Sequence, residues 1–285
     1  MLSKYREKIY ECGDYTEVNI YPVFAPPGPR RKKRFRPTRE TQERLNQKNA
    51  ENKLARILNA NFTEEDVKFE LTYSPEHHPT SEEEAAKELR NFLRRMKRLR
   101  KKKGLPDLKY ITATERGQKK GRYHHHVVAS GGLLPKEIAE LWGRGYVQKI
   151  QPLQFDECGI MGIAKYFPKD QKRNGERLFY KRWNESKNLI HPEAQIRESI
   201  LPGRTIEKLA KDTENRRLYE AVFKGFYLGQ AEVVYNDVNG GIYLIVRLYK
   251  RGARFLCKSK QRNQKNRPAY LDGRNLSNED FQSWH

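Results

Sequence analysis

The stretch Leu108–Ala129, LKYITATERGQKKGRYHHHVVA, decides the fold of the chain around it. Two strand-like runs, LKYITATE and RYHHHVVA, stand on either side of the polar connector RGQKKG. Such runs around a short connector that contains glycine are typical of two antiparallel strands. We therefore expect a β-hairpin at this point of the chain.

The second run of this hairpin carries three consecutive histidines. Because successive side chains of a strand alternate between the two faces, His124 and His126 point to the same side, whereas His125 points to the other. If the connector closes a regular hairpin, the cross-strand pairs are Glu115 with Arg122, Ala113 with His124, and Ile111 with His126. Glu115 then lies on the face of the two histidines.

Two imidazoles and one carboxylate that leave coordination positions open suit a divalent ion that also binds a phosphate oxygen. Mn²⁺ or Mg²⁺ is the expected ion, although Zn²⁺ or Co²⁺ can occupy such a site in vitro. The alternative is a half-exposed strand whose histidines bind no metal. We interpret His125 as packed, and His77 and His78 as solvated loop residues.

The chain outside the hairpin alternates between strands and helices. VKFELTY, residues 67–73, predicts a strand, and Ser81 with Glu84 makes a capping box for a long amphipathic helix that stops at Gly104. Beyond the hairpin we expect a helix over 135–143, a strand over 146–155 and a helix over 156–167. From Arg204 onward we expect one or two helices and two strands around an Asn-Gly-Gly turn. This order predicts an α+β fold with a central antiparallel sheet and flanking helices.

The N-terminal part has a different character. Residues 1–37 lack helical periodicity and contain PPGPRRKKRFRP, so we interpret them as an extended or partly disordered basic arm. From Thr38 to about Leu58 the apolar positions are sparse, which predicts a surface helix. The three cysteines are widely spaced, so we expect neither disulfides nor a cysteine zinc site.

The balance of 58 Lys and Arg against 36 Asp and Glu gives a formal charge of +22 and points to nucleic acid as the partner. No apolar run is long enough for a membrane span, so we expect no membrane partner. Two basic runs, residues 30–36 and 94–103, are expected to bind DNA phosphates. The residues that we assign to this contact are Arg30, Arg31, Lys32, Lys33, Arg34, Arg94, Arg95, Lys97, Arg98, Arg100 and Lys101.

Each of these surface assignments has an alternative. For the second basic run the alternative is a solvated helical face. Tyr73, Trp142 and Trp183 are interpreted as core residues, and stacking on bases is the alternative for them.

The segment AKYFPK places Tyr166 and Lys169 three residues apart at a helix end, hence on one helical face. A phenol and an ammonium group can there meet one phosphate. Tyrosine is a weak nucleophile at its ordinary pKa near 10 and needs a neighbouring cation or a polarised electrophile. Core packing of Tyr166 is the alternative interpretation.

In order, the strand that ends in LTY, the segment TERGQKKGRYHHHVV and the segment GIAKYFPK resemble the three motifs of HUH endonucleases. The likeness is to rolling-circle replication-associated proteins of bacterial plasmid and phage type, and it covers about residues 66–189. It implies that His124, His126 and Glu115 bind the metal, that Tyr166 is the nucleophile and that Lys169 assists it. It also implies a division into an N-terminal arm and helix, 1–62, an endonuclease domain, 63–190, and a C-terminal extension with helices and a β-hairpin, 191–285.

Two departures from the family pattern limit the assignment. The middle histidine occupies a position that is usually apolar, so a shifted register could place His125 at the site. The motif holds a single tyrosine, and Tyr180 is not placed to be a second nucleophile. No G-x-x-x-x-G-K-[ST] loop occurs, so an ATP-driven helicase is not expected and a host helicase would unwind the DNA.

The resemblance implies an enzyme that nicks single-stranded origin DNA, forms a 5'-phosphotyrosine link and frees a 3'-hydroxyl for a host polymerase in a bacterial cytoplasm. Within the same fold the alternative is a single-tyrosine transposase or a relaxase-like nickase. A phosphodiesterase that uses water is a second alternative, and a non-enzymatic nucleic-acid-binding protein is a third. Covalent attachment of DNA to protein separates these interpretations.

Overall fold

The computed structural model describes residues 4–24, 39–117, 121–155, 160–167, 172–173, 176–177, 182–236 and 241–252. Within these ranges the chain forms two five-stranded antiparallel sheets, a two-stranded ladder and six α-helices. This confirms the predicted α+β fold. The basic arm from Arg30 to Arg36 lies outside the described residues.

The sheet that carries the histidines is built from the middle of the chain. Its strand order is β6-β3-β5-β4-β9, with antiparallel pairing throughout. The bounds of these strands are Val147–Pro152, Val67–Thr72, Tyr123–Ala129, Tyr110–Arg116 and Asn184–Glu185. β3 and β4 flank β5, so the central strand of the sheet is the one with the three histidines.

Two helices cover one face of this sheet, α2 (Glu82–Lys102) and α3 (Pro135–Trp142). Alternate residues of β3 and β5, among them Phe69 and Val127, form a core with Phe92 of α2 and Trp142 of α3. The predicted cap is present, since the Ser81 side chain accepts a hydrogen bond from the Glu84 amide. The Glu84 carboxylate, however, accepts from the Thr80 amide rather than from that of Ser81.

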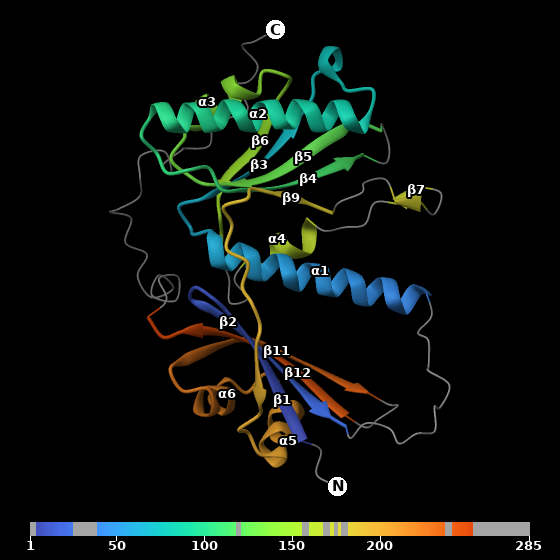
Figure 1. The fold of residues 1–285 in the computed structure, drawn as a ribbon, viewed down its shortest axis with the longest axis vertical. Helices are drawn as coiled ribbons and strands as arrows, with labels where there is room; N and C mark the ends of the chain where they lie inside the picture. Colours follow the sequence, from blue (N-terminus) through green and yellow to red (C-terminus); the bar gives the residue numbers. More distant parts are fainter. Residues whose placement is uncertain are drawn as a thin grey trace.

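The opposite face of the sheet is covered by α1 (Arg39–Asn61) and α4 (Met161–Tyr166). Leu54 and Leu58 of α1 are fully buried and pack with Val128 of β5 and Ala164 of α4. The interpretation of α1 as a surface helix is therefore wrong. In Figure 1 this helix runs between the two sheets, so it has a partner on both sides.

The second sheet joins the two ends of the chain. Its order is β10-β1-β2-β12-β11, and α5 (Gly203–Lys211) and α6 (Arg216–Val222) pack on one face. The bounds of its strands are Gln195–Glu198, Lys4–Cys12, Tyr15–Val23, Gly241–Lys250 and Phe226–Asn236. The expected C-terminal helices and hairpin are thus confirmed. An extended arm over residues 1–37 is wrong for residues 4–24, which form a hairpin through the left-handed Gly13 at φ 70°.

Charged side chains connect α1 to the second sheet. Glu17 of β2 is fully buried and accepts hydrogen bonds from Tyr15 and from Arg56 of α1. Arg247 of β12 is 1% exposed and donates to Asn52 of α1 at 3.2 Å. A polar helical face is therefore buried here because the sheet offers ionic and hydrogen-bonding partners.

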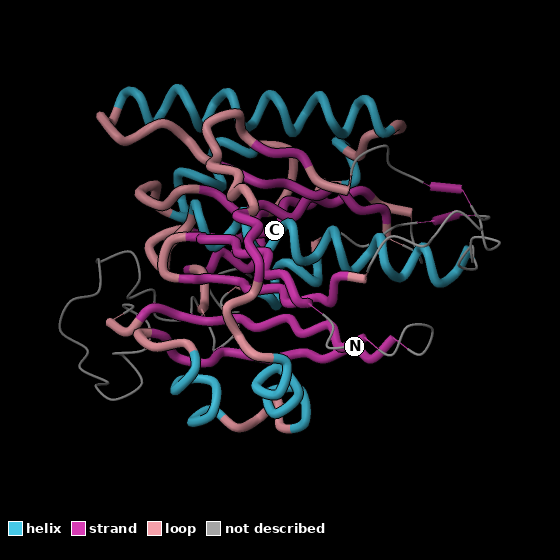
Figure 2. The backbone as a smooth tube through the Cα atoms, turned by 60° about the horizontal axis from the view of Figure 1, so that its bottom comes forward, coloured by secondary structure: helices cyan, strands magenta, loops and turns pink. Residues whose placement is uncertain are grey.

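The layers stack as α2 and α3, the first sheet, α1 and α4, the second sheet, and α5 and α6 (Figures 1 and 2). The short 3-10 helix Pro75–His77 follows β3, and the small ladder pairs β7 (Lys172–Arg173) with β8 (Glu176–Arg177). No helix in the described ranges has the length and hydropathy of a membrane span. The division of the chain at residues 62 and 190 stays a prediction.

Candidate metal centre

The β4–β5 hairpin brings Glu115, His124 and His126 together on one face. Glu115 lies directly opposite His124, and Ala113 lies opposite His126. The predicted pairing was wrong by two residues, because β4 continues to Arg116 and the turn closes through a hydrogen bond from the Gly117 amide to the Arg122 carbonyl. A shift of two leaves every side chain on its predicted face.

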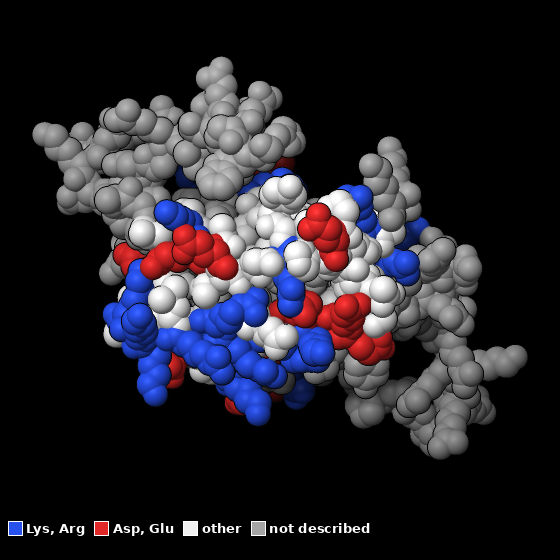
Figure 3. All heavy atoms as spheres, turned by 90° about the horizontal axis from the view of Figure 1, so that it is seen from above, with Lys and Arg blue, Asp and Glu red and all other residues white. Residues whose placement is uncertain are grey.

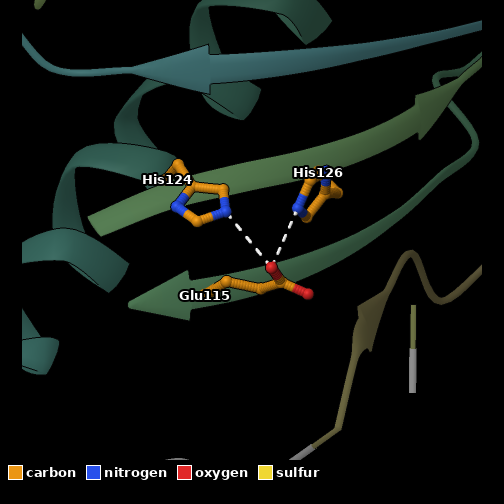
Figure 4. Close-up of side chains that lie close together, drawn as sticks. All are labelled: Glu115, His124 and His126. Carbon is orange, nitrogen blue, oxygen red and sulfur yellow. Dashed lines mark hydrogen bonds and ion pairs between the residues drawn. The ribbon is translucent and has the colours of Figure 1, made fainter. Parts of the chain in front are cut away.

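The three side chains converge on one point (Figure 4). Glu115 Oε2 lies 3.2 Å from His124 Nε2 and 3.3 Å from His126 Nε2. The exposed fraction of the side chain is 26% for His124, 15% for Glu115 and 5% for His126. The site is thus half-buried, with a protein wall behind His126 and access from solvent beside His124.

The charges of the site support one another. Burial alone would raise the pKa of the Glu115 carboxyl, but hydrogen bonds and charges of His124 and His126 outweigh burial and lower this pKa to about 2. The hydrogen bond to Glu115 in turn raises the pKa of His124. In the absence of an ion, the carboxylate therefore holds positive charge on the imidazoles.

The donor set fits a divalent cation. One ligand atom each of Glu115, His124 and His126 lies within 4.8 Å of the others. Two imidazole nitrogens and one carboxylate oxygen are ligands that Mn²⁺, Zn²⁺ and Co²⁺ accept, and three protein ligands leave positions for a substrate oxygen. The described residues can thus hold a metal ion, whose identity the donors alone do not decide.

The middle histidine is a core residue, as expected. His125 is fully buried, with Nε2 2.7 Å from the Tyr73 hydroxyl and Nδ1 2.9 Å from the Thr114 hydroxyl. Burial, together with the charges of its two histidine neighbours, lowers the pKa of His125 to about 3. Its ring lies among Tyr73 and Trp142 on the α2 side of the sheet, so a shifted register with His125 at the metal centre is wrong.

The loop histidines lie away from the metal centre. His78 Nε2 accepts a hydrogen bond from the Tyr123 amide at 3.2 Å, and its ring contacts the rings of Tyr73 and Tyr123. His77 Nδ1 lies 2.9 Å from the Ser74 hydroxyl. Both histidines belong to the loop after β3, and His78 serves its packing.

Helix α4 ends beside the metal centre. The Phe167 ring is 5% exposed and lies 5.9 Å from the His126 ring, measured between centroids. Tyr166 is the last residue of α4 and directly precedes Phe167, so its backbone is fixed at this end of the sheet face. Lys169 lies outside the described residues, and its role stays a prediction.

The basic run at the end of α2 divides into two groups. Arg100 is 3% exposed and donates to the carbonyls of Pro106, Ser130 and Gly131. Arg95 donates to the carbonyls of Leu141 and Trp142 at the end of α3. Assigning Arg100 to DNA is therefore wrong, because its guanidinium is buried among backbone carbonyls, and Arg95 is also used inside the domain.

The other basic side chains of this run are exposed and form a surface that we call the α2 basic patch. Lysine and arginine side chains gather there in Figure 3. The patch consists of Arg94, Lys97, Arg98, Lys101 and Lys102. It lies on the α2 side of the sheet, whereas the metal centre lies on the α1 side.

The aromatic residues weighed for base stacking are core residues. Trp142 is fully buried and donates from Nε1 to the Thr72 carbonyl at 2.8 Å, and Tyr73 is 5% exposed. Trp183 is partly buried against the α1 core and donates to Glu185. Their interpretation as core residues is confirmed.

Sequence reasoning missed one carboxylate beside the centre. Glu70 of β3 lies opposite His126, with Oε1 3.5 Å from His126 Nδ1, and Lys149 of β6 binds Glu70. The signal was present in VKFELTY, because Val67, Phe69 and Leu71 alternate inward and leave Glu70 on the face of the histidines.

The fold and the site together define an α+β domain with a candidate divalent-metal centre on its central sheet. Residues 67–171 match the family model of replication-associated proteins of the ORF2 and gene 2 protein type, and this range contains the metal centre and α4. This part of the chain is a domain of that replication-associated family, which confirms the resemblance at family level. No curated protein and no solved structure matches the chain.

Proposed function

We propose that this protein initiates rolling-circle replication by nicking single-stranded origin DNA with Tyr166 as the nucleophile. The observation that carries the proposal is the position of α4, whose end packs on His126 while that histidine shares the carboxylate of Glu115 with His124. The helix that bears the proposed nucleophile and the candidate metal centre thus lie on one face of one sheet. The replication-associated family match supports the same function.

Glu115, His124 and His126 would hold a divalent ion, Mn²⁺ or Mg²⁺, which would polarise the scissile phosphate and offset the charge that develops there. The Tyr166 oxygen attacks phosphorus in line, the bond from phosphorus to the 3'-oxygen breaks, and the tyrosine stays linked to the 5'-phosphate. The phenol loses its proton and the departing 3'-oxygen gains one. Lys169 would neutralise phosphate charge or lower the phenol pKa.

The energy of the phosphodiester is kept in the phosphotyrosine link, so attack by a new 3'-hydroxyl rejoins strands without ATP. The freed 3'-hydroxyl would prime a host polymerase, and a host helicase would separate the strands in a bacterial cytoplasm. Arg30, Arg31, Lys32, Lys33 and Arg34, together with the α2 basic patch, would bind backbone phosphates. Since the patch lies across the sheet from the metal centre, it would hold DNA that flanks the cleaved segment.

The test uses single-stranded origin oligonucleotides labelled at either end, incubated with Mn²⁺ and separated on a denaturing gel. The expected result is a 3' fragment at protein size that disappears with EDTA and with Tyr166→Phe. Cleavage by Tyr166→Phe without a protein-linked band would contradict the tyrosine mechanism and favour water as the nucleophile. DNA binding without cleavage under all conditions would favour a non-enzymatic nucleic-acid-binding protein.

A further inference from the structure

His126 lies between two carboxylates. Its Nε2 lies 3.3 Å from Glu115 Oε2, and its Nδ1 lies 3.5 Å from Glu70 Oε1. A neutral imidazole carries one proton, and the nitrogen without the proton is the one that can bind a metal ion. A carboxylate beside Nδ1 favours the proton on that nitrogen and leaves the Nε2 lone pair directed at the metal centre.

Glu70 is itself held in place. Lys149 Nζ lies 3.0 Å from both carboxylate oxygens of Glu70. The Glu70 side chain is 19% exposed, whereas that of Lys149 is 65% exposed. The ammonium therefore clamps the carboxylate from the solvent side, and the carboxylate faces the largely buried imidazole.

The backbone of β6 is distorted where it presents Lys149. Lys68 pairs with Gln151 and Glu70 pairs with Gln148, so β6 has one extra residue between these two pairs and forms a β-bulge. Lys149 has φ 53° and is the one non-glycine residue with positive φ in the described ranges. Such a backbone costs about 1–2 kcal/mol in an L-residue.

The bulge changes which side chains of β6 face outward. Val147 and Ile150 both pack against the α2 core, while Gln148 and Lys149 between them are exposed. In a regular strand Lys149 would lie on the face opposite to Gln148 and Glu70. The extra residue brings Lys149 to Glu70, and an ordinary surface ion pair, worth about 0–1 kcal/mol, would not offset the strain.

We propose that Glu70, clamped by Lys149 on the β6 bulge, is a positioning residue that fixes the proton of His126 on Nδ1 and aims Nε2 at the metal ion. Glu70 acts through His126 and is not itself a ligand, since the cluster of mutually close donors contains only Glu115, His124 and His126 among the described residues. The inference rests on the proposed metal centre.

The test measures binding of Mn²⁺ alone, followed by the electron paramagnetic resonance of free Mn²⁺. We expect Glu70→Ala to weaken the affinity about 10- to 100-fold. Glu70→Gln should retain most of the affinity, because the amide oxygen still accepts the Nδ1 hydrogen bond. Glu140→Ala removes a carboxylate that faces Lys136 on α3, away from the centre, and should leave the affinity unchanged.

A second readout is the visible spectrum of bound Co²⁺. A positioning role predicts one ion per chain and an unchanged set of bands in Glu70→Ala once the site is saturated. Changed band energies would show that Glu70 is a ligand, which would overturn the inference. Lys149→Met keeps Glu70 and should weaken Mn²⁺ binding less than Glu70→Ala, so a variant with an intact carboxylate also tests the chain of contacts.

The outcomes separate this inference from the proposed function. If the wild type binds Mn²⁺, His126→Ala abolishes binding and Glu70→Ala binds like the wild type, the positioning role is overturned and the metal centre stands. The role of a hydrogen-bond acceptor is also overturned if Glu70→Gln binds as weakly as Glu70→Ala. Failure of the wild type to bind any ion would overturn the metal centre and the inference together.

Discussion

The ring of Phe167 lies 5.9 Å from the ring of His126 and fixes the end of α4 against the metal centre. A smaller side chain at this position should displace the backbone of Tyr166. We expect Phe167→Leu to slow strand cleavage about 10- to 100-fold, because a displacement of about 1 Å can have that effect on a reacting group. Its Mn²⁺ affinity should remain that of the wild type, which titration of the metal would measure.

Phe92→Leu is the matched control for this prediction. Phe92 is fully buried on the other face of the same sheet. Both substitutions should lower the free energy of unfolding by about 1 kcal/mol, but only Phe167→Leu should slow cleavage. Equal cleavage rates in the two variants would contradict a positional role of Phe167.

The pairing of Glu115 with His124 predicts how the metal-free protein responds to pH. The pKa of Glu115 is lowered from 4.5 to about 2, so its contribution to stability is present above pH 4.5 and is lost as the pH falls toward 2. The pKa of His124 is raised above 6.5, so its contribution is present below pH 6.5 and is lost as the pH rises through the folded value. This pair therefore stabilises the metal-free protein most between pH 4.5 and 6.5.

A metal ion should reverse this dependence above neutral pH. The ion binds neutral imidazoles, so a proton on His124 competes with it. We expect Mn²⁺ to raise the melting temperature more at about pH 8 than at about pH 6, given an ordinary histidine pKa near 6.5. Thermal unfolding with and without Mn²⁺ at both pH values measures this. An equal rise at the two values would show that His124 is not a ligand.

The α2 basic patch should contribute to DNA affinity and not to stability. Replacing its exposed residues by glutamine should weaken binding to single-stranded DNA and lower the slope of log affinity against log salt by roughly 0.7 for each phosphate that the protein no longer neutralises. The free energy of unfolding should stay within about 0.5 kcal/mol, because these side chains are exposed and glutamine is a good helix former. The substituted residues are Arg94, Lys97, Arg98 and Lys101.

Arg100 in the same run should behave in the opposite way. Arg100→Leu leaves the carbonyls of Pro106, Ser130 and Gly131 without their buried donor. We expect a decrease of about 2–4 kcal/mol in the free energy of unfolding, measured by urea denaturation. A variant as stable as the wild type, with weakened DNA binding, would return Arg100 to the DNA-binding group.

The buried contact between Tyr73 and His125 should stabilise the domain. Tyr73→Phe removes the hydroxyl that lies 2.7 Å from His125 Nε2, and we expect a decrease of about 1–3 kcal/mol in the free energy of unfolding. Tyr146 is 61% exposed, so Tyr146→Phe serves as the control and should change stability by less than about 0.5 kcal/mol. Urea denaturation of both variants makes the comparison.

The metal centre could be predicted because it depends on local geometry. Strand alternation alone places Glu115, His124 and His126 on one face, and that parity survived an error of two residues in the register. Glu70 was missed because it belongs to a strand that is separated from the hairpin by α2 in the sequence. Its contact with His126 depends on which strands become neighbours, which the local pattern does not specify.

The N-terminal hairpin and the burial of α1 were missed for a related reason. The Gly13-Asp14 turn between two runs of alternating residues is a hairpin signal, but the basic run after Phe24 directed attention to an arm. α1 has few apolar residues because its second face contacts Glu17, Glu232 and Arg247 of the second sheet instead of an apolar core. A rule that equates polar with exposed fails where the partner is also charged.

The closure of the second sheet by both ends of the chain has a consequence during synthesis on the ribosome. Every strand of the histidine-bearing sheet lies between Val67 and Glu185, so that sheet can assemble while later residues are still being added. β2 pairs with β12, which begins at Gly241, so the N-terminal hairpin waits for the last strands to emerge. The late pairing has a high contact order and should be the slow step of folding. A nascent chain would thus acquire its metal centre before it acquires its second sheet.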